Sequence, residues 1–204
     1  MTRLVILSDT HSYHDHVKVP TGDLVIHCGD YSGRGEEGDT IAFLRWFNAL
    51  PHVSKVLVSG NHDRASDITP DLFRQWLVEY APTVTYLQDS GVEIAGLKLW
   101  GSPVTPTFFN WYHMRERGAA IRAHWDLIPD DTDVLITHGP AYGYHDWSDY
   151  GKEHGGCRDL YEAILRVRPK VACHGHFHGA WGTKDLHHND GSTTTMVNAS
   201  VCDE

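Results

Sequence analysis

The sequence of 204 residues lacks the long apolar segments and the targeting signals of membrane and secreted proteins. No apolar run approaches the roughly 20 residues that cross a bilayer. The run LVIL near the amino terminus has only four apolar residues, which is too short for the core of a signal peptide. The sequence also contains no internal repeat, low-complexity tract or linker-like stretch. We therefore expect a cytoplasmic protein without a membrane partner, folded as a single domain over residues 1–204.

An excess of positive charge is also missing. The chain has 17 Lys and Arg residues against 27 Asp and Glu residues, which gives a formal net charge of −10 at pH 7. It contains no lysine-rich run that would concentrate positive charge locally. Because the nucleic-acid backbone is itself negative, this balance argues against non-specific binding to nucleic acid.

Paired cysteine motifs are absent too. The four cysteines, Cys28, Cys157, Cys173 and Cys202, are widely spaced and form no CxxC pair. In a chain of this length without a secretion signal, we expect reduced thiols and no disulfide framework. Histidine, by contrast, is abundant, with 16 residues. Because histidine is the commonest metal ligand, its distribution indicates where to look for a site.

Short apolar runs that are typical of buried strands lead directly into groups of metal-binding residue types. The runs cover residues 3–8, 23–28, 55–59, 133–137 and 170–173. The groups that follow them are Asp9-Thr10-His11, Gly29-Asp30, Gly60-Asn61-His62-Asp63, His138-Gly139-Pro140 and His174-Gly175-His176-Phe177-His178. Continuous Val, Ile and Leu runs are typical of strands that are covered on both faces.

Helical patterns separate these strands. The spacing of apolar residues predicts helices over residues 39–50, 70–80 and 157–168, and a weaker one over 115–125. Strands that alternate with helices imply a largely parallel α/β sheet, which binds ligands beyond the carboxyl ends of its strands. Five groups at five such ends would then meet in one place.

Two further segments predict strands of a different kind. Residues 84–101 contain strand-like pieces separated by turn residues, as in a hairpin or meander, and residues 192–201 are rich in Thr and Val. These segments predict a second, mixed sheet packed on the first. The fold class expected is therefore α/β, with two packed mixed β-sheets flanked by helices.

Each group alone has an ordinary structural explanation. An aspartate such as Asp9 at a strand end is often a turn residue, and an isolated histidine is more often hydrogen-bonded than a ligand. Gly60 and Gly175 could serve only to allow tight turns. The occurrence of all five groups in this order, each at a strand end, favours a metal site.

The motifs DTH, GD, GNHD, THGP and GHFH, between residues 9 and 178, resemble those of the calcineurin-like metallophosphoesterase superfamily. The GNHD and GHFH spellings are similar to class III cyclic-nucleotide phosphodiesterases. Segments such as YLQDS, LKLWGSPVTP, FFNW and ITHGPAYGYHDW are closer still to the metallophosphoesterase-domain proteins of animals and their microbial relatives. Some animal members lack the first histidine of the last motif. This chain keeps His176, which favours a competent second metal site.

The resemblance implies two metal ions bound by seven residues. Asp9, His11 and His178 would hold one ion, Asn61, His138 and His176 would hold the other, and Asp30 would bridge both. Carboxylate, imidazole and amide donors suit Mn²⁺, Fe²⁺ or Fe³⁺, and Zn²⁺. In such centres the two ions activate a shared water as hydroxide and hold the phosphate oxygens.

The resemblance also implies roles for residues that are not ligands. His62 follows Asn61 directly, and we assign it as the proton donor to the leaving group or as a stabiliser of the transition state, with Asp63 orienting it. A merely supporting histidine is the alternative. GDYSGRG resembles the GDYVDRG run of serine/threonine phosphoprotein phosphatases, in which the arginine binds phosphate. Arg34 is thus a candidate substrate contact, with a solvated loop arginine as the alternative, and Arg64 shares that ambiguity.

The function that these features favour is hydrolysis of small phosphodiesters, with 2′,3′- or 3′,5′-cyclic nucleotides as substrates. A phosphomonoesterase or phosphoprotein phosphatase on the same site is one alternative, and a non-catalytic scaffold of the same fold is another. We expect most aromatic rings of residues 108–112 and 142–147 to pack between the two sheets, the alternative being to stack on a nucleobase. His14 and His16 are expected near the mouth of the site.

Overall fold

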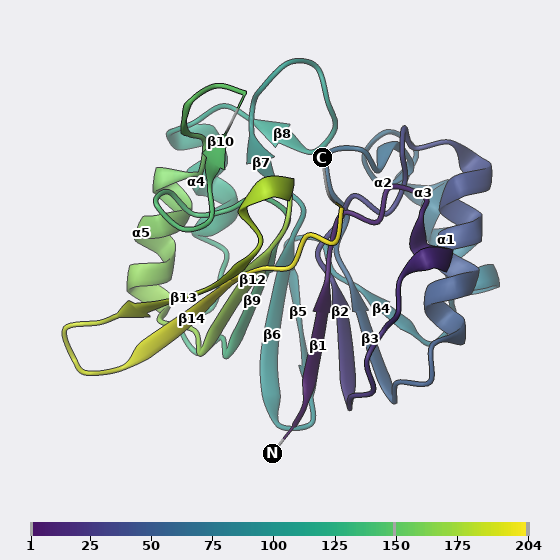
Figure 1. Cartoon of the computed structure of the whole chain (residues 1–204), viewed down its shortest axis with the longest axis horizontal. Helices are drawn as coiled ribbons and strands as arrows, with labels where there is room; N and C mark the ends of the chain where they lie inside the picture. Colours follow the sequence, from purple (N-terminus) through teal and green to yellow (C-terminus); the bar gives the residue numbers. More distant parts are fainter. Residues whose placement is uncertain (1, 149, 203–204) are drawn as a thin grey trace.

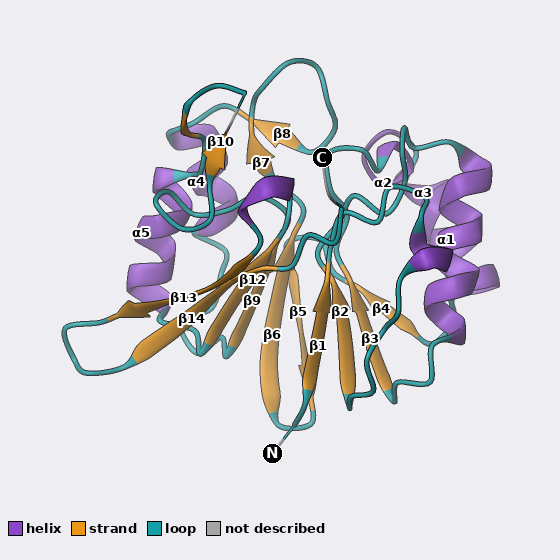
Figure 2. Cartoon of the chain, in the orientation of Figure 1, coloured by secondary structure: helices purple, strands orange, loops and turns teal. Residues whose placement is uncertain are grey.

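Two β-sheets stack face to face, and helices cover the outer face of each sheet (Figures 1 and 2). A computed structural model describes residues 2–148 and 150–202. No described helix is long and apolar enough to cross a membrane. Cys28, Cys157 and Cys173 are buried free thiols.

The first sheet is parallel throughout, in the order β1-β2-β3-β4. Its strands are β1 (Leu4–Leu7), β2 (Leu24–His27), β3 (Ser54–Leu57) and β4 (Val84–Tyr86). Helices α1 (Glu37–Ala49) and α3 (Pro70–Tyr80) cover its outer face, where Phe43 and Phe73 are buried in one apolar cluster with Val25 of β2.

The second sheet is mixed, in the order β13-β14-β12-β9-β6-β5. Its strands are β5 (Ser90–Ile94), β6 (Leu97–Ser102), β9 (Val134–Thr137), β12 (Val171–His174), β13 (Gly182–His187) and β14 (Thr193–Asn198). The four central strands are parallel, whereas β5 and β13 pair antiparallel at the two edges. Helices α4 (Ala119–Trp125) and α5 (Arg158–Val167) cover the outer face of this sheet.

Several short elements lie in the loops at the end of the sheets toward which β1, β2 and β3 run. These are η1 (His14–His16), α2 (Arg64–Ile68), β7 (Thr105–Pro106), β8 (Met114–Arg115), β10 (Trp147–Ser148), β11 (Glu153–His154) and η2 (His178–Ala180). Sequence patterns do not predict them because each is too short to show a period.

The core between the sheets explains the continuous apolar runs. Ile26 and Val56 of the first sheet form one buried cluster with Leu99 and Ile136 of the second. Neighbouring residues such as Val25 face the helices on the other side. Each central strand is therefore buried on both faces, as its sequence indicates.

The predicted α/β class with two packed sheets flanked by helices is confirmed, but both sheets were expected to be mixed and the first is parallel throughout. The five motif-bearing strands do not share one sheet, because β9 and β12 pair with β6 and β14 in the second sheet. The segment 84–101 is also divided, since β4 joins the first sheet beside β3. The helix predicted over 115–125 begins only at Ala119.

His27 lies within β2, where it is completely buried and electrically neutral. The backbone N–H of Gly29 donates to its Nδ1 at 3.3 Å, so the ring proton lies on Nε2, 3.2 Å from Oγ1 of Thr10. Burial lowers the pKa of His27 to about 3 from its ordinary value of 6.5, although Asp9 opposes that shift. The folded state therefore excludes a proton that the unfolded chain binds below pH 6.5.

We predict that this exclusion has no effect on stability above pH 6.5, where both states are neutral, and that it destabilises the folded state increasingly as the pH falls from 6.5 toward 3. Below pH 6, each unit by which the pH falls should lower the free energy of unfolding by up to about 1.4 kcal/mol through the contribution of His27. The variant His27→Asn keeps an acceptor for the Gly29 N–H but cannot titrate. The free energy of unfolding, measured with urea between pH 7 and 4, should therefore fall less steeply with pH for this variant than for the wild type. Equal slopes for the two proteins would contradict the neutral state of His27.

Candidate metal centre

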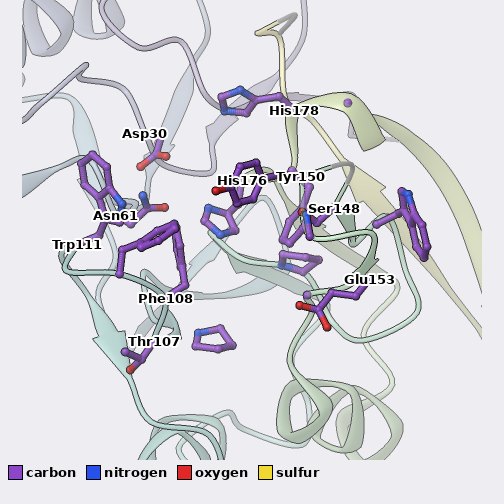
Figure 3. Close-up of a pocket in the computed structure, with 18 of the residues that line it drawn as sticks. Asp30, Asn61, Thr107, Phe108, Trp111, Ser148, Tyr150, Glu153, His176 and His178 are labelled. Atoms are coloured by element: carbon purple, nitrogen blue, oxygen red, sulfur yellow. The ribbon is translucent and has the colours of Figure 1, made fainter.

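The predicted site residues meet at the carboxyl ends of strands from both sheets. The loops after β1, β2 and β3 face the loops after β9 and β12, so the site lies where the two sheets adjoin (Figure 1). Figure 3 shows Asp30, Asn61, His176 and His178 around one opening. The structure therefore brings together residues that are up to 169 positions apart in the chain.

A first group of potential ligands comprises Asp9, His11 and His178. The Nε2 atoms of His11 and His178 lie 3.1 Å apart. Nε2 of His178 is 3.5 Å from Oδ1 of Asp9, and Nε2 of His11 is 4.0 Å from the same oxygen. This is the set that the sequence assigns to one metal ion.

A second group comprises Asp30, His138 and His176, with Asn61 beside it. The Nδ1–H of His138 donates to the carbonyl of Cys28 at 2.9 Å, which leaves Nε2 to face the site. Nε2 lies 2.9 Å from Oδ1 of Asn61 and 3.2 Å from Oδ2 of Asp30. The same Asp30 oxygen is 3.9 Å from Nε2 of His11, so Asp30 lies between the two groups as the sequence predicts.

Two glycines allow the backbone to touch the carboxylates. A Cβ atom on Gly175 would lie 2.0 Å from Oδ2 of Asp9, and one on Gly60 would lie 2.3 Å from Oδ1 of Asp30. Neither glycine has a positive φ. Glycine is therefore needed at both positions because a side chain would collide with Asp9 or Asp30, whereas the sequence suggested that these glycines allow tight turns.

The backbone around the carboxylates adopts the left-handed region, which is uncommon for residues with a side chain. The φ angles are 56° at Asp9, 40° at His11, 54° at Asp30 and 69° at His176. Hydrogen bonds hold these residues in place, including those from the N–H of His176 to both carboxylate oxygens of Asp9, at 3.0 and 3.1 Å. Such strain persists only where the surroundings fix it, and it concentrates at functional sites.

The two carboxylates are buried with histidines as their only basic neighbours among the described residues. Asp9 is 0% exposed and Asp30 is 2% exposed, and no lysine or arginine within residues 2–148 and 150–202 forms an ion pair with either. Burial alone would raise the pKa of Asp30, but His138, His62 and His11 hold it well below its usual range. A buried charge requires compensation, and this donor set of carboxylates and imidazoles fits metal cations.

The histidines of the second group differ in their proton affinity. Burial opposes the charge on His138, but Asp30 raises the pKa of His138 to about 9. Burial, together with the nearby His138, lowers the pKa of His176 to about 3. A bound cation would therefore have to displace the proton of His138, whereas His176 is already in the neutral form that binds metal.

His62 lies beside both groups. A ring nitrogen of His62 is within 4.8 Å of the ligand atoms of His11 and Asp30. Its Nδ1–H donates to the carbonyl of Gly33 at 2.5 Å, and its backbone N–H donates to Oδ1 of Asp30 at 2.8 Å. Nε2 is therefore the ring atom that is available for proton transfer.

The predicted role of Asp63 needs correction. Its carboxylate accepts hydrogen bonds from the backbone N–H groups of Asp30, Gly60 and Ser32, at 2.7–3.1 Å, and from the Ser32 hydroxyl. Asp63 thus holds the loop that carries Asp30, and the Gly33 carbonyl, not Asp63, orients the His62 ring. Burial and the neighbouring Asp30 raise the pKa of Asp63 to about 8, although its backbone donors oppose that shift.

Arg34 does not line the opening over the metal groups. It borders a separate hollow of about 660 Å³ together with Arg64, and the indole of Trp111 forms part of the wall of both spaces. The alternative of a solvated loop arginine is therefore the better description of Arg34.

A pocket of about 710 Å³ extends from the metal groups (Figure 3). Aromatic side chains border it, among them Phe108, Phe109, Trp111, Trp147 and Phe177. The expectation that most of the rings in residues 108–112 and 142–147 pack between the sheets is wrong for these loop residues. The cluster FFNW was the available signal, but its place over the site depends on the path of the β7–β8 loop.

His14 and His16 do not line this pocket. His14 is buried beside α1, with its ring 5.7 Å from that of Phe43, and His16 is exposed. Burial lowers the pKa of His14. These residues belong to the outer layer of the first sheet, because η1 turns back toward α1.

Comparisons with known proteins show the family and the fold of this chain. The family model described as "Calcineurin-like phosphoesterase" matches residues 2–180. The human protein "Metallophosphoesterase domain-containing protein 1" is 37% identical over 98% of this chain, which spans 66% of that relative's length. A UPF0046 protein of Caenorhabditis elegans is 35% identical over 99% of this chain and 70% of its own length. The structure of a phosphopantetheinyl hydrolase from Mycobacterium tuberculosis has a TM-score of 0.63 at 14% identity, covering 98% of this chain and 89% of that one, which shows a shared fold.

We predict that each chain binds two metal ions and that substitutions of different ligands reduce the number of bound ions to different extents. Asp30→Asn should reduce the content below one ion, because Asp30 lies between both groups, whereas His178→Ala should leave one ion. His124→Ala is the matched control, because this histidine pairs with Asp89 at 2.8 Å away from the site. Elemental analysis after dialysis against Mn²⁺ or Zn²⁺ measures the content, and two retained ions in Asp30→Asn would contradict the assignment.

Proposed function

The chain belongs to the calcineurin-like phosphoesterase family, and we propose that it is a dinuclear metal-dependent phosphodiesterase acting on small diesters. Cyclic nucleotides, either 2′,3′ or 3′,5′, are the substrate class we favour. The observation that carries the proposal is one pocket whose lining combines potential metal ligands with several aromatic side chains. Such a pocket suits a phosphate that carries a flat organic group.

The residues of the centre have distinct parts in this proposal. Asp9, His11 and His178 would hold one ion, and Asn61, His138 and His176 the other, with Asp30 shared. When bound, the two ions supply positive charge for the phosphate oxygens and lower the pKa of a water molecule. Mn²⁺, iron and Zn²⁺ all suit these donors.

His62 would donate a proton to the leaving oxygen. Its Nδ1–H bond to the carbonyl of Gly33 persists in both protonation states, because that carbonyl can only accept. The proton that is transferred is therefore the one on Nε2. This fixed tautomer suits a general acid next to the phosphate.

The charges of the pocket favour a diester over a monoester. Arg117 is the one lysine or arginine among the described residues that line it, and its two terminal nitrogens donate to the carbonyls of Gly155 and Gly156. Arg34 borders a different hollow. A monoester dianion would therefore meet little positive charge beyond the metal ions, whereas a diester carries only one negative charge.

A non-catalytic scaffold is the less favoured function. Such a protein would not need two adjacent groups of potential ligands, nor a histidine with a fixed tautomer beside them.

We predict a strong preference for bis-p-nitrophenyl phosphate over p-nitrophenyl phosphate in the presence of Mn²⁺. Both release the same chromophore, so the ratio of kcat/KM values reports on the diester preference. Asp30→Asn should abolish both activities. Preference for the monoester would instead support a phosphatase, and no activity on either compound, or on a panel of cyclic nucleotides, would favour the scaffold.

The variant His62→Ala should lower kcat by about 10²-fold or more, which is typical of a lost general acid. Its metal content should be unchanged, because we assign His62 no ligand role. The loss should be greatest for diesters whose leaving group is a poor one, such as a ribose hydroxyl. Unchanged turnover on such a substrate would exclude His62 as the proton donor.

A further inference from the structure

The indole of Trp111 stacks on the ring of His62. The two ring centroids are 4.2 Å apart and the planes are inclined by only 27°. We propose that Trp111 is a positioning residue that fixes the orientation of His62, an inference that rests on the proposed function. Trp111 is not assigned a role by its sequence context beyond its membership of an aromatic cluster.

The contacts around His62 leave its ring one orientation. Trp111 covers one face, the carbonyl of Gly33 holds Nδ1 at 2.5 Å, and the ring of His11 meets it edge-on at a centroid distance of 4.7 Å. The hydrogen bond alone would still permit small combined changes of χ1 and χ2 that tilt the ring relative to the Gly33 carbonyl. The stacked indole limits that tilt, because it lies against one face of the ring.

Trp111 is itself tied to the segment that carries His62. It lies in the loop between β7 and β8, and the N–H of the next residue, Tyr112, donates to the carbonyl of Asn61 at 3.2 Å. His113 then donates its N–H to Oδ2 of Asp67 at 3.1 Å, and its Nε2 lies 2.7 Å from Oγ of Ser66. The indole therefore keeps its place relative to the backbone around His62.

The same indole separates two spaces. On one side lies the pocket over the metal groups, and on the other lies the hollow bordered by Arg34 and Arg64. Removal of the indole would join these two spaces. It would also expose to water the face of the His62 ring that the indole covers. Both effects would reduce the fraction of time in which Nε2 faces the leaving oxygen.

Trp111 also borders the pocket, so direct contact with substrate is the competing explanation. The two explanations differ in what they predict. A contact with the substrate should act mainly on KM and should persist when His62 is absent. A positioning role should act on kcat and should vanish when His62 is absent, because the two residues then act as one unit.

The test is a double-mutant cycle with Trp111→Ala, His62→Ala and the combined variant, measured on a cyclic nucleotide and on bis-p-nitrophenyl phosphate. We expect Trp111→Ala to lower kcat by about 10- to 100-fold, as misplaced catalytic groups do, with KM changed less than twofold. When Trp111→Ala is introduced into the His62→Ala variant, kcat should fall by less than a factor of two. Trp111→Phe retains a stacking ring and should restore most of the activity.

Trp181→Ala is the matched control, because this tryptophan is 66% exposed and lies outside the pocket over the metal groups. Its activity should equal that of the wild type, and thermal unfolding should show that every variant is folded. The positioning role would be overturned if the combined variant lost the product of the two single losses in kcat. It would also be overturned if Trp111→Ala changed only KM. If His62→Ala alone loses nothing on any substrate, the proton-donor role of His62 fails, whereas the proposed function fails only if the wild type prefers the monoester or hydrolyses neither compound, so these failures are distinguishable.

Discussion

Two buried carboxylates, Asp9 and Asp30, which no lysine or arginine of the described residues pairs with, are the constraint on which the rest of the site depends. Their negative charge can be compensated only by protonated histidines or by cations from solution. His138, whose pKa is raised, is a histidine that can carry the compensating proton. The other imidazoles of the site, together with the carboxylates, are potential ligands for cations. The electrostatics of the acidic chain are therefore local: a protein with a net charge of −10 can still present a positive face to phosphate once ions are bound.

The backbone is shaped to serve these carboxylates. Gly60 and Gly175 admit main chain to within contact of Asp30 and Asp9, and left-handed residues turn the loops inward just after the strands end. Asp63 uses its whole carboxylate to hold the loop of Asp30. The rigid sheets supply the anchor for this arrangement, because strained loops hold their shape only when both ends are fixed.

Much of the site could be predicted from the sequence, since each potential ligand follows directly after an apolar strand. The position of Asp30 between two groups and the pairing of His11 with His178 agree with the expected sets. The division of the strands between two sheets could not be predicted, because strand pairing depends on which helices cover which face. The contacts of Asp63, Arg34 and Trp111 are set by the paths of loops, which have no periodic signal in the sequence.

The location of the site between the two sheets has a consequence for the lifetime of the folded chain. One potential ligand set joins the loops after β1 and β12, where Asp9 and His178 are 169 positions apart, and the other joins the loops after β2, β3, β9 and β12. An ion bound in either set would close a long loop of chain, as a disulfide does, but in a form that a chelator removes. Resistance to proteolysis would then follow the supply of metal by mass action, and turnover of the chain would be coupled to the metal status of its surroundings.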